Sequence, residues 1–118
     1  MEILVAHEPI DEATLAELAQ AWHRTFVKGV ADLDRRIIAL GGDWHMDANN
    51  RLIADGSRQE NLWGFNIYPV ERGDAAIEYN SVINIRPAQG NRAMEITSEE
   101  LRVMVRAVVA PFIPYLGL

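Results

Sequence analysis

The residues around His45 are the best placed, by type and spacing, for acid–base chemistry. His45 and Asp47 stand two positions apart in the polar run 43–47, and Asp55 follows shortly after. An imidazole held by a carboxylate can act as a general base, so we predict catalytic roles for His45, Asp47 and Asp55, with His45 as the base. The same groups could ligate a divalent metal, but metal sites need three or four converging ligands, and no metal ligand is assigned. The alternative is structural, with Asp47 capping a short helix and Asp55 in the turn that ends it.

A second set of polar side chains shares one face of a predicted sheet. Polar and apolar residues alternate over 62–68 and again over 76–86, which predicts two strands that pair as a hairpin. Asn is a poor strand former, so several asparagines on one face indicate hydrogen-bond partners in a ligand or a neighbouring loop. An ordinary solvated sheet face is the alternative. The face holds Asn66, Tyr68, Glu78, Asn80, Asn84 and Arg86, and all except Glu78 are candidate ligand-binding residues.

The loop from Arg86 to Arg92 is a candidate anion site. Guanidinium groups and backbone amides together bind phosphate or carboxylate, so Gln89, Asn91 and Arg92 join Arg86 as predicted ligand-binding residues. No phosphate-binding P-loop and no dinucleotide fingerprint accompanies them. A surface turn in which Arg86 pairs with an acidic residue is the alternative.

These candidates need a scaffold, and the apolar patterns predict one α+β domain over 1–118. We expect a mixed or antiparallel sheet of about four to five strands, two longer helices and one short helix. The expected strands are 2–6, a hairpin over 27–40 with its turn at 34–36, 62–68 and 76–86, and the short helix is 47–55 with Gly56 at its end. The first long helix begins at Asp11 or Thr14, and the last begins at a capping box over 97–100.

Each long helix has one predicted buried face. The residues expected in the core are Leu15, Leu18, Ala19, Trp22 and Phe26 in the first helix and Leu101, Met104, Val105, Val108 and Phe112 in the last. The apolar tail 111–118 should pack on the domain or on a second subunit, so a homodimer through this tail is possible.

Composition excludes several classes of protein. The chain has 118 residues, a net charge of −6 and no cysteine, so disulfides, thiolate zinc sites and cysteine nucleophiles are excluded. We do not expect nucleic-acid binding, because the chain is acidic overall and lacks the excess of basic residues that binding to phosphates requires. No segment reads as a signal peptide or a membrane span, so we expect a cytoplasmic protein with no membrane partner.

Several unusual motifs along the chain together resemble a known family. They are Gly41-Gly42 leading into His45-Met46-Asp47-Ala48, Asp55-Gly56-Ser57-Arg58-Gln59 followed by Leu62-Trp63-Gly64, Asn66-Ile67-Tyr68-Pro69, and Ile83-Asn84-Ile85-Arg86-Pro87 with Gln89-Gly90-Asn91-Arg92. These motifs, together with the opening strand and Glu8-Pro9, resemble a family of short bacterial and archaeal proteins known only as a domain of unknown function. The resemblance covers most of the chain. The tail beyond Pro111 is longer and more apolar than that family leads us to expect. The resemblance implies no activity.

Two functions remain open at this point. The first is the binding, with or without catalysis, of a small anionic or polar ligand by the polar face and loops. The second is a protein–protein or regulatory module, as a homodimer or a toxin–antitoxin-type partner, in which the polar motifs are structural. No cofactor is predicted.

Overall fold

The computed structural model describes all residues, 1–118, as one α+β domain. Its main elements are β1 (Leu4–Ala6), α1 (Glu12–Ala21), β2 (Val27–Asp32), β3 (Ile37–Leu40), α2 (His45–Ala54), β4 (Leu62–Ile67), β5 (Ile77–Glu78) and α3 (Glu99–Val109). Short 3₁₀ turns fill much of the chain between β4 and α3 and after α3.

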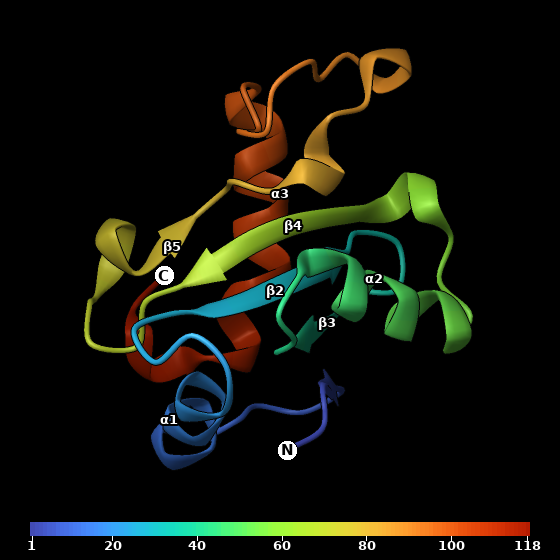
Figure 1. The fold of residues 1–118 in the computed structure, drawn as a ribbon. Coiled ribbons are helices and arrows are strands. Elements are labelled where there is room, and N and C mark those ends of the chain that lie inside the picture. Colours follow the sequence, from blue (N-terminus) through green and yellow to red (C-terminus); the bar gives the residue numbers. More distant parts are fainter.

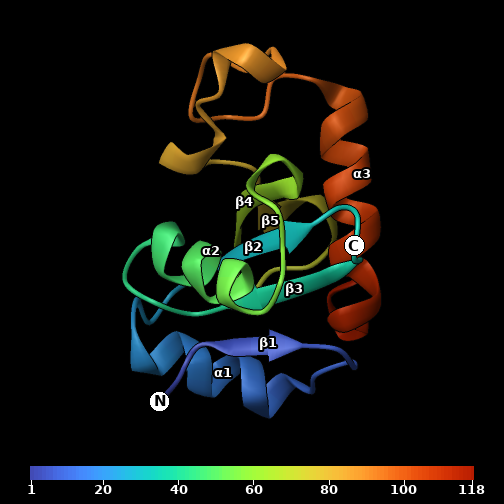
Figure 2. The same cartoon turned by 90° about the vertical axis from the view of Figure 1, so that its right-hand side faces the viewer.

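The strands form one antiparallel sheet in the order β1-β3-β2-β4-β5. Figure 1 shows α3 behind the sheet and α2 in front of it, and Figure 2 shows the sheet between these two helices, with α1 beside β1. The α+β prediction is confirmed, and the sheet is antiparallel rather than mixed. Because β2 pairs with both β3 and β4, residues of β2 and β4 lie in the middle of the sheet.

The helices begin at the caps that the sequence predicts, with one shift. Asp11 accepts a hydrogen bond from the backbone N of Thr14 at 2.8 Å and caps α1, and Ser98 caps α3. The prediction that Asp47 is the first cap of α2 is wrong, because α2 starts at His45. Asp47 lies in the first turn instead, where its Oδ2 accepts from the backbone N of Trp44 at 3.0 Å. A carboxylate in the first turn still stabilises the positive end of the helix.

The predicted helical faces are mostly in the core. The buried members are Leu15, Leu18, Ala19, Val105, Val108 and Phe112, whereas Trp22 and Leu101 are half-buried. Two predictions are wrong: Met104 is 47% exposed, and Phe26 lies beyond the end of α1. Val109 is buried in α3, a residue the sequence analysis did not select.

The predicted strand over 76–86 is wrong beyond Glu78. After β5, the segment Val82–Asn84 forms a 3₁₀ turn that crosses β4 closely. A Cβ atom on Gly64 would lie 2.6 Å from Cβ of Ser81, so only glycine allows this approach. The Ser81 side chain starts the turn by accepting a hydrogen bond from the backbone N of Ile83 at 3.2 Å.

The apolar tail packs on its own domain. Phe112, Ile113 and Leu116 are buried in the same core as the sheet, and the backbone N of Ile10 donates to the carbonyl of Phe112 at 2.8 Å. Of the two predicted placements of the tail, on its own domain or on a second subunit, the structure therefore shows the first. A homodimer through this segment stays a prediction. No helix combines the length and apolar character that crossing a bilayer requires.

Candidate functional site

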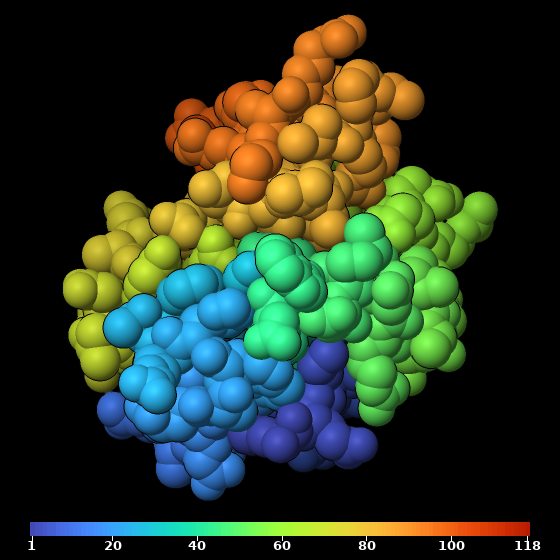
Figure 3. Space-filling view, viewed as in Figure 1, coloured from blue at the N-terminus to red at the C-terminus, as the bar shows by residue number.

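A pocket of about 500 Å³ lies on the face of the sheet that carries α2. Figure 3 shows this side of the molecule, where the green residues of α2 lie against the yellow and orange segment that follows β5. The pocket lining comprises Phe26, Lys28, Trp44, His45, Met46, Asn66, Tyr68, Glu78, Asn80, Ser81, Val82, Ile83 and Met94. Ligand pockets of proteins commonly have volumes of about 300–1,000 Å³, so this one suits a small molecule.

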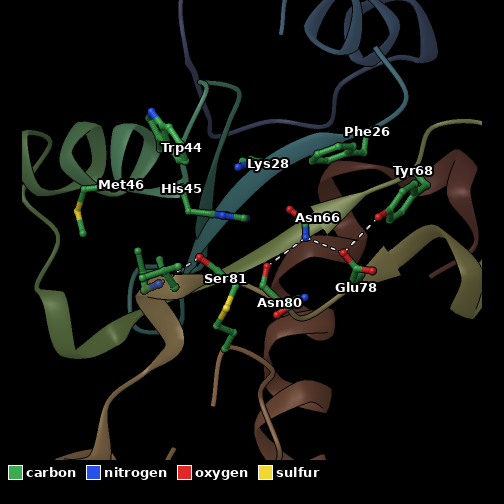
Figure 4. A pocket seen from close by; sticks show the side chains of 13 residues that line it. Phe26, Lys28, Trp44, His45, Met46, Asn66, Tyr68, Glu78, Asn80 and Ser81 are labelled. Carbon is green, nitrogen blue, oxygen red and sulfur yellow. Dashed lines mark hydrogen bonds between the residues drawn. The ribbon is translucent and has the colours of Figure 1, made fainter. Parts of the chain in front are cut away.

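The floor of the pocket is a row of three side chains on neighbouring strands. Lys28 of β2 is the partner of Asn66 in β4, and Asn66 is the partner of Glu78 in β5. Directly opposite residues of paired strands point to the same face, so the three side chains stand side by side. Figure 4 shows Asn66 between Lys28 and Glu78. An ammonium and a carboxylate thus stand at the two ends of the row.

Hydrogen bonds fix the Glu78 end of this row. Oε1 of Glu78 accepts from Nδ2 of Asn66 at 2.8 Å and from the hydroxyl of Tyr68 at 3.2 Å. Nδ2 of Asn66 also donates to the carbonyl of Asn80 at 3.1 Å. Burial, followed by the nearby Glu78 charge, raises the pKa of Tyr68, so its hydroxyl keeps its proton and acts as a donor.

The two charges of the row lack an ion-pair partner, and one buried acceptor lacks a donor. Lys28 and Glu78 take part in no ion pair. Asn66 is only 6% exposed, and its buried Oδ1 accepts no hydrogen bond. A buried acceptor without a donor is costly, and such groups in native proteins usually meet water or a ligand. In Figure 4 this oxygen points away from Glu78, toward the side where Lys28 lies.

Aromatic and apolar side chains surround the polar floor. Nζ of Lys28 lies 5.3 Å from the centre of the Trp44 ring, in the range of a cation–π contact. On another side, the rings of Phe26 and Tyr68 contact each other in a tilted arrangement at a centroid distance of 5.8 Å. Large apolar residues are exposed at this site, which soluble domains usually avoid outside binding surfaces: Trp44 (68% exposed), Val82 (66%), Met46 (46%) and Met94 (43%).

His45 enters the pocket from the first turn of α2. Its Nε2 lies 2.9 Å from the carbonyl oxygen of Phe65, and because a carbonyl only accepts, Nε2 carries the proton. Nδ1 of the neutral ring is then an acceptor that makes no hydrogen bond within the protein. Burial lowers the pKa of His45, and the nearby Lys28 charge acts in the same direction, whereas the contacts with the Phe65 carbonyl and the Asn66 side chain act against this shift.

The two predicted carboxylate partners of His45 are engaged elsewhere. Asp47 accepts from the backbone of Trp44, as described above. Asp55 follows the last turn of α2, at the opposite end of the helix from His45, and its Oδ2 lies 2.7 Å from Nη2 of Arg35. That contact lowers the pKa of Asp55. The structure therefore does not bring Asp55 to His45, and no group of three or more His, Asp or Glu side chains converges.

The predicted anion loop forms an internal hydrogen-bond network. Asn84 pairs with the backbone of Gly64, and Asn91 donates to the carbonyls of Asn84, Ala93 and Glu95. Both asparagines are buried, at 0% and 3% exposed. Their side chains are fully used within the fold.

Arg86 and Gln89 fasten the same loop to the start of β4. The Arg86 guanidinium stacks over Trp63 at 3.7 Å from the ring centre and donates to the carbonyls of Gln59 and Leu62. Burial lowers its pKa. Gln89 donates to the carbonyl of Glu60 at 2.9 Å. Arg92 is exposed and makes no hydrogen bond or ion pair, so the two arginines do not form a clamp.

Eight of the predicted site residues therefore fall into two groups, whereas Asp47, Asp55 and Arg92 belong to neither. The pocket collects His45, Asn66, Tyr68 and Asn80, and the network collects Asn84, Arg86, Gln89 and Asn91. Sequence analysis did not select Lys28, Phe26, Trp44 or the methionines of the rim. One signal was available: Lys28 is the only lysine of the chain and stands in an apolar strand.

Comparison with protein families identifies the class of the protein. A family described as "Protein of unknown function (DUF5674)" matches residues 4–112. The match covers nearly the whole fold, and the chain belongs to this family. Comparisons with curated proteins and with solved structures gave no match.

Proposed function

We propose that this protein binds a small polar molecule in the pocket between α2 and the segment after β5. The observation that carries the proposal is the row Lys28–Asn66–Glu78 at the floor of a cavity of about 500 Å³, in which the two charges form no ion pair and the buried Oδ1 of Asn66 has no donor. Polar groups without partners in a largely apolar cavity are the usual marks of a ligand site. Asn80, Tyr68 and His45 supply further hydrogen-bonding groups.

The binding surface differs from a simple anion site. Arg86 already uses its guanidinium on backbone carbonyls, so its charge is directed into the fold. Lys28 supplies the positive charge of the pocket, and Glu78 balances it. His45 is the candidate base if the bound molecule is also transformed, because its Nδ1 is an unengaged acceptor.

A thermal-shift screen of small polar metabolites tests the proposal, because a ligand of the folded state raises the apparent stability. Lys28→Met removes the pocket ammonium and keeps a side chain of similar length. Arg92→Met is the matched control, since it removes an exposed charge that has no partner. Compounds that bind in the pocket should raise the melting temperature of the wild type and of Arg92→Met, and much less that of Lys28→Met.

The opposite result would contradict the proposal. If every stabilising compound protects Lys28→Met as strongly as the wild type, while Arg92→Met loses the effect, the ligand site lies at the loop before α3. If no compound stabilises the wild type at millimolar concentration, small-molecule binding is not its function.

A second candidate function is contact with a protein partner at the pocket mouth. Four large apolar side chains are exposed around it, with Trp44 at 68% and Val82 at 66% the most accessible. We propose that the protein forms a homodimer through this mouth or binds a partner of toxin–antitoxin type. We also propose that it works in a prokaryotic cytoplasm, a reducing compartment in which a chain without cysteine is expected. Sedimentation of the wild type and Trp44→Ser tests self-association: a dimer through this mouth should dissociate in the variant. A dimer through the tail 111–118 should be unaffected.

A further inference from the structure

We propose that the pocket ligand is an amino-acid-like zwitterion with an apolar side chain. The inference rests on the proposed small-molecule site and names the class of its ligand. It follows from the order of charges along the floor, from the absence of an ion pair between them and from the apolar walls.

The charges at the two ends of the floor do not pair with each other. Lys28 and Glu78 lie on β2 and β5, with β4 between them, so their Cα atoms are about 10 Å apart at about 4.8 Å per strand. Neither joins an ion pair with any other residue. A ligand that carries one charge would complement only one end of the row.

A zwitterion complements both ends in one orientation. Its carboxylate would meet the ammonium of Lys28. Its ammonium would meet the free oxygen of Glu78, whose Oε1 already accepts two hydrogen bonds, and Oδ1 of Asn66 in the middle of the row could accept a further hydrogen bond from it. Charge-assisted hydrogen bonds of this kind are about twice as strong as neutral ones. Oδ1 of Asn66 has no donor within the protein, which favours a ligand that carries one.

The remaining surface of the pocket suits an apolar group. Met46, Val82, Ile83 and Met94 line the cavity beside the polar floor. Methionine side chains adapt to ligands of different shape, so several apolar or aromatic amino acids could fit. A cavity of about 500 Å³ leaves room for such a side chain beyond the charged groups.

Isothermal titration with matched ligands tests the inference. The probes are L-leucine, L-methionine and L-phenylalanine, each compared with its amide, which lacks the carboxylate, and its N-acetyl derivative, which lacks the ammonium. We expect at least one free amino acid to bind, and each blocked derivative of it to bind about tenfold more weakly or worse, because one charge-assisted contact is lost.

Two variants assign the ends of the ligand. Lys28→Met should weaken the binding of the free amino acid about tenfold. It should leave the already weak binding of the amide unchanged, because the amide lacks the carboxylate that Lys28 meets. Glu78→Gln should weaken the binding of the free amino acid and leave the binding of the N-acetyl derivative unchanged. Arg92→Met should not change the affinity for the free amino acid or for either derivative.

Other outcomes separate this inference from the proposed function. An N-acetyl derivative that binds as tightly as the free amino acid would overturn the zwitterion and indicate an anion. An amide that binds equally well would overturn it and indicate the N-terminus of a peptide. If no amino acid binds, but another metabolite stabilises the wild type and not Lys28→Met, the inference fails and the pocket function stands. If nothing binds, both fail.

Discussion

The side-chain amide of Asn84 pairs with the backbone of Gly64 in the way that a neighbouring strand would. Its Oδ1 accepts from the Gly64 N at 2.8 Å, and its Nδ2 donates to the Gly64 carbonyl at 3.0 Å. β5 ends at Glu78, so this part of the β4 edge has no strand beside it. One asparagine thus completes the hydrogen bonding of an edge that the backbone leaves open.

Asn84→Ala should therefore reduce the free energy of unfolding by about 2–4 kcal/mol, because two buried backbone groups lose their partners. Urea denaturation followed by circular dichroism measures the loss. Asn50→Ala is the control, since Asn50 is exposed on α2 and makes no side-chain hydrogen bond. Equal effects of the two substitutions would show that the Asn84 pairing contributes little.

The close crossing at Gly64 predicts a compensating pair of substitutions. Gly64→Ala should destabilise the fold strongly, because the new Cβ would lie 2.6 Å from Cβ and 2.8 Å from Oγ of Ser81. Ser81→Gly removes both of those atoms. The double variant should be more stable than Gly64→Ala alone, although Ser81→Gly by itself is destabilising through the loss of its bond to Ile83. Thermal unfolding of all four proteins gives the coupling, and strict additivity would contradict the crossing.

Arg86 and Arg92 should differ sharply in their effect on stability. Arg86→Ala removes a guanidinium that stacks on Trp63 and fastens the loop to the backbone before β4, so we expect a loss of about 1–3 kcal/mol. Arg92→Ala should change stability by less than about 0.5 kcal/mol, as exposed side chains usually do. Chemical denaturation of both variants is the measurement. An Arg86 variant of unchanged stability that loses binding of phosphate would restore the anion-site interpretation.

The elements of the fold that depend on local patterns could be predicted from the sequence. Asp11 and Ser98 cap their helices by hydrogen bonds to backbone groups three residues away, and the turn between β2 and β3 covers residues 33–36, close to the predicted 34–36. The strand after Ile77 could not be predicted in the same way. The period-two pattern continues to Arg86, but Ser81 and Asn84 bond to backbone groups and replace the ladder that the pattern implies.

The candidate site could be predicted only in part, because local sequence patterns place some of its residues and pairing between distant strands places the others. Asn66 and Tyr68 could be placed on a polar face because Asn66 lies in β4 and Tyr68 follows directly after it, with Ile67 between them. Lys28 could not be added, because its position beside Asn66 depends on the pairing of β2 with β4. That pairing joins residues far apart in the chain, and no local pattern encodes it.

His45 should make the stability depend on pH below 6.5, the ordinary pKa of an imidazole. Burial lowers its pKa in the folded protein below the ordinary 6.5, so the unfolded chain binds the proton more strongly. The stabilisation is therefore fully present above pH 6.5 and declines as the pH falls toward the folded-state pKa. Relative to His45→Asn, the wild type should lose stability over this window in pH-dependent denaturation. The exposed His7 provides the control, His7→Asn, which should follow the wild type. Parallel curves for wild type and His45→Asn would contradict the burial effect.

Trp44 should be the tryptophan that reports the state of the pocket. It is 68% exposed at the mouth, whereas Trp63 is 3% exposed and Trp22 is half-buried, so acrylamide should quench mainly Trp44. Trp44→Phe should remove most of the quenching, and Trp22→Phe should remove little, which Stern–Volmer plots of the three proteins will show. Any compound that raises the melting temperature through the pocket should also protect Trp44, because the ring lies above Lys28 at the entrance. A stabilising compound that leaves Trp44 equally open to acrylamide would have to bind elsewhere on the molecule.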